Sequence, residues 1–171
     1  MKKFDFNIYL IGFMGAGKST IAKALQSKLD MDVVEMDQMI VDEQGMAITD
    51  IFEKYGEDHF RDIETETLKK LKKKGSTIVS CGGGIVVRDE NAGLMKEDGK
   101  VIFLTARPET ILDRVKDSTD RPILNGNMNV EFIEGLMAKR KDKYMAVADH
   151  QVATDGKNSD EISDEIIGLL S

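Results

Sequence analysis

The sequence predicts an α/β domain in which a mainly parallel sheet carries helices on both faces. Short apolar runs alternate with helical periodicity along the chain, and repeated strand-helix-strand units place their strands parallel. A glycine-rich loop joins the first apolar run to the first helical pattern. The chain has 171 residues, 41% of them hydrophobic, which is enough for one compact domain with a single core.

The elements follow one another in a regular order. Apolar runs predict strands over residues 6–11, 32–36, 77–81, 100–105 and 151–153. Helical patterns cover residues 18–29, 37–44, 48–72, 90–97, 108–116, 129–148 and 159–170. No repeat or flexible linker interrupts them, so we expect one domain over residues 1–171. Ligands of such sheets bind at the carboxyl ends of the strands, where the motifs below begin.

The loop after the first strand fits the phosphate-binding pattern Gly-x-x-x-x-Gly-Lys-Ser/Thr over residues 12–19. Its glycines let backbone N–H groups turn toward a polyphosphate, and the next helix points its positive end at the same anion. Lys18 adds a charge near the β- and γ-phosphates, and Ser19 is left to hold Mg²⁺. A chance glycine turn explains this pattern less well. We therefore expect ATP-type nucleotide binding by Gly15, Ala16, Gly17, Lys18, Ser19 and Thr20.

Two carboxylates follow the second strand. Glu35 and Asp37 are two residues apart, so on a strand they project to one side and face the phosphate loop. One would order the Mg²⁺ shell, and the other would contact the hydroxyl to be phosphorylated. The alternative for Asp37 is a simple helix cap.

Two apolar helical stripes are each interrupted by a charged residue, Glu64 in one and Arg140 in the other. Glu64 lies on the stripe formed by Phe60, Leu68 and Leu71, with Arg61 within reach for an ion pair. Buried charges are costly without partners, so an anionic ligand held by Arg61 and oriented by Glu64 explains them better than a surface pair. Arg140 interrupts the stripe Ile133, Met137, Tyr144 and Val147 in the same way. It extends either into water or into a cleft, where its guanidinium would grip a carboxylate.

A glycine triplet and a polar loop complete the set of motifs. Gly82, Gly83 and Gly84 follow the third strand and allow a ligand to approach the backbone closely. Residues 116–128 are polar and turn-rich, which is typical of a lid that closes over nucleotide and brings Arg121 onto the transferring phosphate. An ordinary surface loop is the alternative.

The composition excludes several classes of partner. The net charge of −7 and pI of about 4.9 argue against binding to nucleic acid or to anionic membranes. Cys81 is the single cysteine, which favours a reducing compartment, and polar residues in the N-terminal apolar stretch argue against a signal peptide. We expect a cytoplasmic protein.

Together these motifs resemble the shikimate kinase family. The resemblance includes residues 12–19, Asp37, Phe60-Arg61 with Glu64, the glycine triplet, Arg121-Pro122 and the segment 137–140 with Tyr144. It implies a three-layer, nucleoside-monophosphate-kinase-like fold with five parallel strands in the order 2-3-1-4-5, usually monomeric. It also implies Mg²⁺- and ATP-dependent phosphorylation of the 3-hydroxyl of shikimate, which gives shikimate 3-phosphate in aromatic amino acid biosynthesis.

The same resemblance implies roles for individual residues. Asp37, Arg61, Arg140 and the glycines would hold shikimate, Lys18 and Arg121 would stabilise phosphate charge, and Arg114 would lie near adenine. The helical region at about 37–72 would bind substrate, and a lid at about 116–128 would close over it. The sequence departs from the family at Glu35, where Asp is usual, and at residues 154–157, which lack the usual Arg and Pro beside adenine.

Three other functions compete with this interpretation. A nucleoside monophosphate kinase shares the loop and core, but its acceptor site should recognise a base. A sugar-acid kinase such as one for gluconate is chemically nearer, and the full set of arginines, Glu64 and glycines argues against it. A GTP-dependent switch has some support from the Asp-x-x-Gly match at residues 42–45, but the Asn-Lys-x-Asp guanine motif is missing.

Overall fold

The computed structural model describes residues 4–116 and 129–171 and centres on a five-stranded parallel sheet. Its strands are β1 (Asn7–Ile11), β2 (Asp32–Glu35), β3 (Thr77–Ser80), β4 (Gly99–Thr105) and β5 (His150–Ala153). The order across the sheet is β2-β3-β1-β4-β5, and every neighbouring pair is parallel. This confirms the predicted strands, to within one residue at each end, and their order.

Helices connect the strands. They are α1 (Lys18–Lys28), α2 (Met36–Gln44), α3 (Ile48–Tyr55), α4 (Glu57–Lys74), α5 (Asp89–Asp98), α6 (Pro108–Val115), α7 (Val130–Val147) and α8 (Ser159–Leu170). A short 3₁₀ turn, η1 (Ile85–Val87), follows the glycine triplet. The sequence analysis did not predict this turn.

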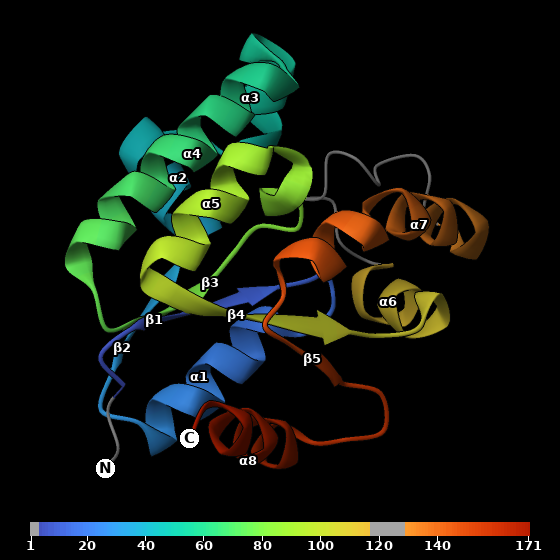
Figure 1. Cartoon of the computed structure of the whole chain (residues 1–171). Coiled ribbons are helices and arrows are strands. Elements are labelled where there is room, and N and C mark those ends of the chain that lie inside the picture. Colours follow the sequence, from blue (N-terminus) through green and yellow to red (C-terminus); the bar gives the residue numbers. More distant parts are fainter. Residues whose placement is uncertain (1–3, 117–128) are drawn as a thin grey trace.

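The central strand shows why the fold has three layers. Ile8 and Leu10 pack in the cluster that contains residues of α1 and α8, whereas Tyr9 and Ile11 pack in the cluster with residues of α4 and α5. Successive side chains of a strand point to opposite faces, so a continuous apolar run needs a helical layer on each side. In Figure 1, α1 and α8 cover one face and α4 and α5 cover the other.

The prediction of one helix over residues 48–72 was wrong. Gly56 has φ +88° and separates α3 from α4. Residues other than glycine rarely adopt this backbone conformation, and the chain turns at Gly56. Because of this turn, the Phe52 ring packs on the Phe60 ring, with 5.0 Å between their centroids. The apolar periodicity continues across the glycine, which is why the break was not detected.

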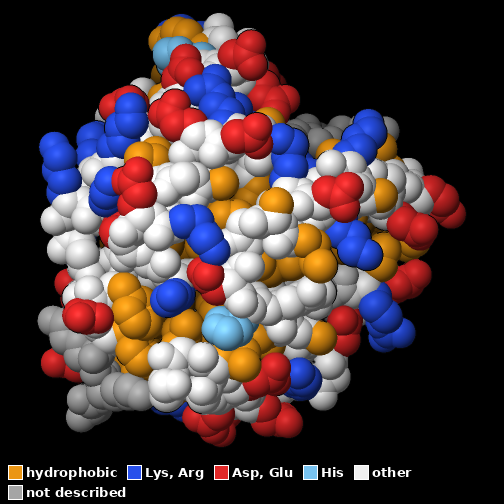
Figure 2. Space-filling model, in the orientation of Figure 1, with side chains coloured by type: hydrophobic (Ala, Val, Ile, Leu, Met, Phe, Trp, Pro, Cys, Tyr) orange, Lys and Arg blue, Asp and Glu red, His pale blue; other side chains and the backbone are white. Residues whose placement is uncertain are grey.

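The surface carries charges of both signs. On the face shown in Figure 2, Lys and Arg side chains are interspersed with Asp and Glu. Within residues 4–116 and 129–171, none of the helices combines the length and apolar character that a membrane span requires. The predicted lid, including Arg121, lies outside the described residues except for Lys116.

Candidate active site

The loop after β1 encloses a lysine at the carboxyl end of the sheet. Gly17 is the N-cap of α1, with φ +98°, and Lys18 opens the helix. The buried Nζ of Lys18 donates to the carbonyl oxygens of Gly12 at 2.7 Å and Phe13 at 3.0 Å. The strand, loop and helix predicted for nucleotide binding are therefore present, with the cation held inside the loop.

A cavity of about 770 Å³ opens beside this loop and collects many of the predicted site residues. Three residues from α2 and α3, which the sequence analysis did not single out, add part of its wall: Val41, Ile48 and Thr49. The predicted residues that line it are Gly15, Gly17, Lys18, Ser19, Thr20, Glu35, Asp37, Gly82, Gly83 and Arg114.

Glu35 lies next to the serine expected to bind Mg²⁺. The Ser19 hydroxyl donates to Glu35 Oε2 at 2.9 Å, whereas Oε1 of Glu35 is buried and has no hydrogen-bond partner in the described part of the chain. A buried carboxylate oxygen normally finds a partner, and magnesium is commonly bound by one or two protein oxygens with water and phosphate. The Ser19 hydroxyl and the Glu35 carboxylate therefore fit a magnesium site.

Asp37 lies in the first turn of α2 and not on a strand, so the strand geometry predicted for it was wrong. Glu35 is the N-cap of this helix, and the helix has no side-chain cap, which rules out the capping alternative for Asp37. Its Oδ1 stands 2.8 Å from the point where a Cβ of Gly82 would lie. Asp37 thus faces the glycine triplet and lines the cavity beside the phosphate loop.

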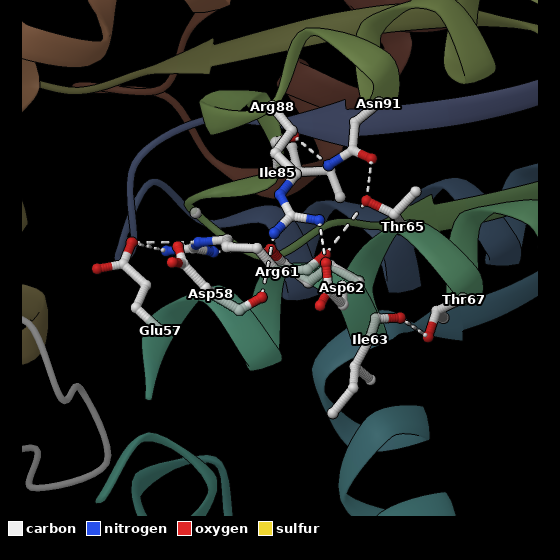
Figure 3. Close-up of polar contacts among 12 residues, drawn as sticks. Glu57, Asp58, Arg61, Asp62, Ile63, Thr65, Thr67, Ile85, Arg88 and Asn91 are labelled. Atoms are coloured by element: carbon white, nitrogen blue, oxygen red, sulfur yellow. Dashed lines mark hydrogen bonds and ion pairs between the residues drawn. The ribbon is translucent and has the colours of Figure 1, made fainter. Parts of the chain in front are cut away.

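Arg61 and Glu64 form a buried ion pair on α4. Their exposed fractions are 4% and 1%, and Nη1 of Arg61 is 2.7 Å from Oε1 of Glu64. Glu57 adds a second carboxylate at 3.2 Å from Arg61 Nη2 (Figure 3). Phe60, Leu68 and Leu71 are also buried, so the prediction of a charged pair on a buried stripe is confirmed.

The environment of this pair displaces both pKa values. Burial raises the pKa of Glu64 to about 7; Arg61 opposes this shift, and Asp37 adds to it. Burial lowers the pKa of Arg61, but Glu64 and Glu57 outweigh it and the net pKa is raised. Arg61 therefore stays charged, and Glu64 is the member of the pair that titrates.

The glycine triplet contacts these polar groups closely. A Cβ on Gly82 would meet Asp37 Oδ1 at 2.8 Å and Glu64 Oε2 at 2.9 Å, and one on Gly84 would meet the Arg61 guanidinium at 2.3 to 2.5 Å. Neither site can hold a side chain without displacing these groups. Glycine is therefore needed at Gly82 and Gly84 so that Asp37, Glu64 and Arg61 can pack against the backbone there.

Arg140, on α7, lies beside the same glycine triplet, although it follows the triplet in the sequence and Arg61 precedes it. It is buried, its guanidinium lies 5.9 Å from the Phe13 ring centroid, and its Nη1 lies 3.8 Å from the Cβ position of Gly83. Within residues 4–116 and 129–171, this Nη1 has no hydrogen-bond partner. The nearby Tyr144 hydroxyl donates to the Gly83 carbonyl. Both misplaced arginines thus converge on one short segment, as the sequence predicted.

The predicted site residues do not all line the cavity. Arg61, Glu64 and Arg140 are buried against the glycines, whereas Asp37, Gly82 and Gly83 form the wall itself. Arg114 lies at the other end of the cavity, where its Nη1 donates to the Gly15 carbonyl at 2.8 Å and to Thr154 Oγ1 at 3.3 Å. It therefore borders the phosphate loop.

Comparison with known proteins agrees with this geometry. A family model described as shikimate kinase matches residues 14–171. The shikimate kinase of Persephonella marina is 43% identical over 164 residues, which are 96% of this chain and 98% of that protein. That of Thermodesulfovibrio yellowstonii is 41% identical over 161 residues, or 94% and 92% of the two chains. A solved shikimate kinase from Acinetobacter baumannii, in complex with shikimate, has a TM-score of 0.94 and 30% identity and covers 98% of this chain and 94% of its own.

Proposed function

The chain belongs to the shikimate kinase family, and on this premise we propose that it transfers the γ-phosphoryl group of ATP to the 3-hydroxyl of shikimate. The products are ADP and shikimate 3-phosphate, in aromatic amino acid biosynthesis. The observation that carries the acceptor assignment is the buried Nη1 of Arg140, which lies beside Gly83 and lacks a hydrogen-bond partner among the residues that the structure describes. A carboxylate bound there would supply the missing acceptor.

Arg61 is the second cation of the acceptor site. Its guanidinium lies against Gly84 and is oriented by Glu64, so both arginines present charge at the triplet. A planar guanidinium binds a carboxylate through two parallel hydrogen bonds. Arg61 and Arg140 hold the carboxylate of shikimate, and Gly82, Gly83 and Gly84 let its ring approach the backbone.

The opposite end of the cavity binds the nucleotide. Gly15, Ala16, Gly17, Lys18, Ser19 and Thr20 surround the phosphates, and Arg114 lies toward adenine. Support for this comes from the loop geometry and from Arg114 on the Gly15 carbonyl. Lys18, together with Arg121 from outside the described residues, neutralises charge that develops on the transferring phosphate.

Mg²⁺ is the metal that these residues fit. Ser19 would hold it directly, and Glu35 would hold it through water, since the side chain reaches the serine hydroxyl and keeps a second buried oxygen without a partner. When bound, the ion would offset the negative charge of the phosphates. The longer side chain of Glu35 replaces the usual Asp without losing contact with Ser19.

Asp37 acts on the hydroxyl that attacks the phosphate. Its carboxylate faces the triplet from the cavity wall, so it lies between the acceptor site and the phosphate loop. It orients the 3-hydroxyl and accepts its proton as the bond to phosphorus forms. Catalysis then rests mainly on positioning and on electrostatic stabilisation of the phosphoryl group.

The remaining proposals concern the whole chain. Residues 1–171 form one domain, with a substrate-binding helical region at about 37–72 and a lid at about 116–128. The protein works as a monomer in the cytoplasm, without nucleic acid or membrane as a partner. The net charge of −7 and the mixed charges in Figure 2 support the exclusion of nucleic acid.

An ADP-release assay over a panel of acceptors tests the proposed function. The panel contains shikimate, quinate, gluconate, AMP and CMP, each with ATP and Mg²⁺. We expect rapid ADP release with shikimate and background release with gluconate and the nucleotides. Release with AMP or gluconate but not with shikimate would replace the proposed acceptor.

A further inference from the structure

A chain of buried polar groups links three elements behind the acceptor site. Thr65 lies on α4 and Asn91 on α5, and Ile85 directly follows the glycine triplet (Figure 3). The Thr65 hydroxyl lies 2.7 Å from Asn91 Oδ1, and Asn91 Nδ2 donates to the Ile85 carbonyl at 2.9 Å. Thr65 is 4% exposed and Asn91 is fully buried.

The chemistry of the groups fixes the direction of each bond. The Ile85 carbonyl can only accept, so the amide nitrogen of Asn91 must face it. This leaves the amide oxygen toward Thr65, whose hydroxyl is the donor. One N–H of the Asn91 amide therefore donates to Ile85 while its oxygen accepts from Thr65, and buried polar networks of this kind specify one arrangement of the elements that they join.

The buried polar groups also connect back to Arg61. The single Thr65 hydroxyl proton is shared with the Arg61 carbonyl oxygen, which lies farther away, at 3.2 Å, one helical turn earlier. The Arg61 guanidinium in turn lies against Gly84, the residue before Ile85. Arg61, Thr65, Asn91, Ile85 and Gly84 therefore form a closed circuit. Its polar bonds set how far α4 stands from the triplet.

A second link between these parts lies at the surface and is weaker. Arg88 pairs with Asp62 and donates to the Asp58 carbonyl at 3.1 Å. The Asp62 side chain is mostly exposed, and exposed pairs contribute little to stability. The buried circuit is thus the stronger constraint on the position of α4 relative to the triplet.

We propose that Thr65 and Asn91 are positioning residues for the acceptor, which hold the Arg61 guanidinium at the distance from Gly84 that the carboxylate needs. The proposal rests on the proposed function. Among the described residues that line the cavity beside the nucleotide loop, neither Thr65 nor Asn91 is present. Their loss should therefore weaken acceptor binding selectively, because displacement by about 1 Å can cost on the order of a hundredfold in rate.

The chain offers a matched control on the same helix. Thr67 is also buried, but its hydroxyl bonds only to the Ile63 carbonyl of its own helix, at 2.8 Å (Figure 3). A valine at either position keeps the shape of threonine and removes the hydroxyl. Thr65→Val breaks the link between elements, whereas Thr67→Val removes only a bond within α4.

The experiment measures kcat and the KM values for shikimate and ATP in the wild type, Thr65→Val, Thr65→Ser and Thr67→Val. Thr65→Val should raise the KM for shikimate by about tenfold or more and change the KM for ATP by less than about twofold. Thr65→Ser, which keeps the hydroxyl, and Thr67→Val should stay close to the wild type. If Thr65→Val is too unstable to assay, Thr65→Cys replaces it, with Thr67→Cys as the control. The thiol of Thr65→Cys is a weaker donor than the hydroxyl, so this variant should raise the KM for shikimate about threefold.

The outcomes separate this proposal from the proposed function. A wild type that does not phosphorylate shikimate overturns the proposed function. An active wild type whose Thr65→Val variant matches Thr65→Ser or Thr67→Val overturns only the positioning role. An equal rise in both KM values in Thr65→Val also overturns it, because a general loss of structure would affect ATP as much as shikimate.

Discussion

The guanidinium of Arg61 lies so close to Gly84 that a Cβ on this glycine would stand 2.3 Å from Nη1. The absence of a side chain at Gly84 is therefore what allows the arginine to occupy its buried position on the triplet. This relationship connects a glycine that looks like a turn residue to the charge that we assign to acceptor binding.

Gly84→Ala should consequently displace Arg61 and impair acceptor binding. We expect the KM for shikimate to rise by about tenfold or more with little change in the KM for ATP. Gly93→Ala is the matched control, because a Cβ there meets no atom within 4 Å and alanine favours the helix. Steady-state kinetics on both variants measures the two KM values. An unchanged KM for shikimate in Gly84→Ala would contradict the claim that a side chain at residue 84 displaces Arg61.

Lys18→Met should abolish turnover without unfolding the protein. The methionine keeps the apolar stem but loses the ammonium that the loop carbonyls hold, so the phosphoryl charge is no longer offset. We expect kcat to fall by about a hundredfold or more, with an unchanged circular dichroism spectrum. Turnover near that of the wild type would refute the role of Lys18.

Glu35→Gln should weaken the binding of Mg²⁺. The amide keeps an oxygen for Ser19 but loses the negative charge near the magnesium site, so half-maximal activity should require more Mg²⁺, by about threefold or more. Asp32→Asn, at the exposed start of the same strand, is the control. Chelation by EDTA should stop both enzymes. Identical magnesium titrations in Glu35→Gln and the wild type would count against this site.

The buried Glu64 should make the free energy of unfolding depend on pH. Its pKa rises from 4.5 to about 7 in the folded chain, so between these values the folded state holds a proton that the unfolded state has lost. Stability should thus fall as pH rises through this range, by at most about 1.4 kcal/mol per pH unit, and stay level above it. Urea unfolding of the wild type and Glu64→Gln over pH 5 to 8 should show this decline as a difference between the two, and parallel curves would contradict it.

Much of the fold could be predicted because strands and helices produce apolar patterns between residues that are close in the sequence. The apolar runs gave the strands to within one residue, and the stripe Phe60, Leu68 and Leu71 correctly indicated that Glu64 is buried. The break at Gly56 was missed because the apolar period runs across it. Asp37 falls within the helical pattern predicted over residues 37–44, but the strand geometry assumed for Glu35 and Asp37 was wrong because β2 ends at Glu35.

The site was predictable in part for the same reason. A charge on an apolar stripe is visible in the sequence, so both arginines could be found. Thr65 and Asn91 are polar residues among other polar residues, and their partners lie on different elements. The one available signal was the position of Thr65 four residues after Arg61 and three before Leu68, beside the buried stripe.

The most direct test of the account compares shikimate with its methyl ester, in which the carboxylate charge is removed, as acceptors for the wild type and for Arg140→Met. Methionine keeps an apolar side chain and removes the guanidinium, which lies 5.9 Å from the Phe13 ring centroid. The wild type should prefer the acid by about a hundredfold or more in kcat/KM, and the preference should nearly vanish in the variant while the KM for ATP stays unchanged. Equal use of acid and ester by the wild type, or an undiminished preference in Arg140→Met, would contradict the claim that buried guanidinium groups at the glycine triplet hold the acceptor by its carboxylate.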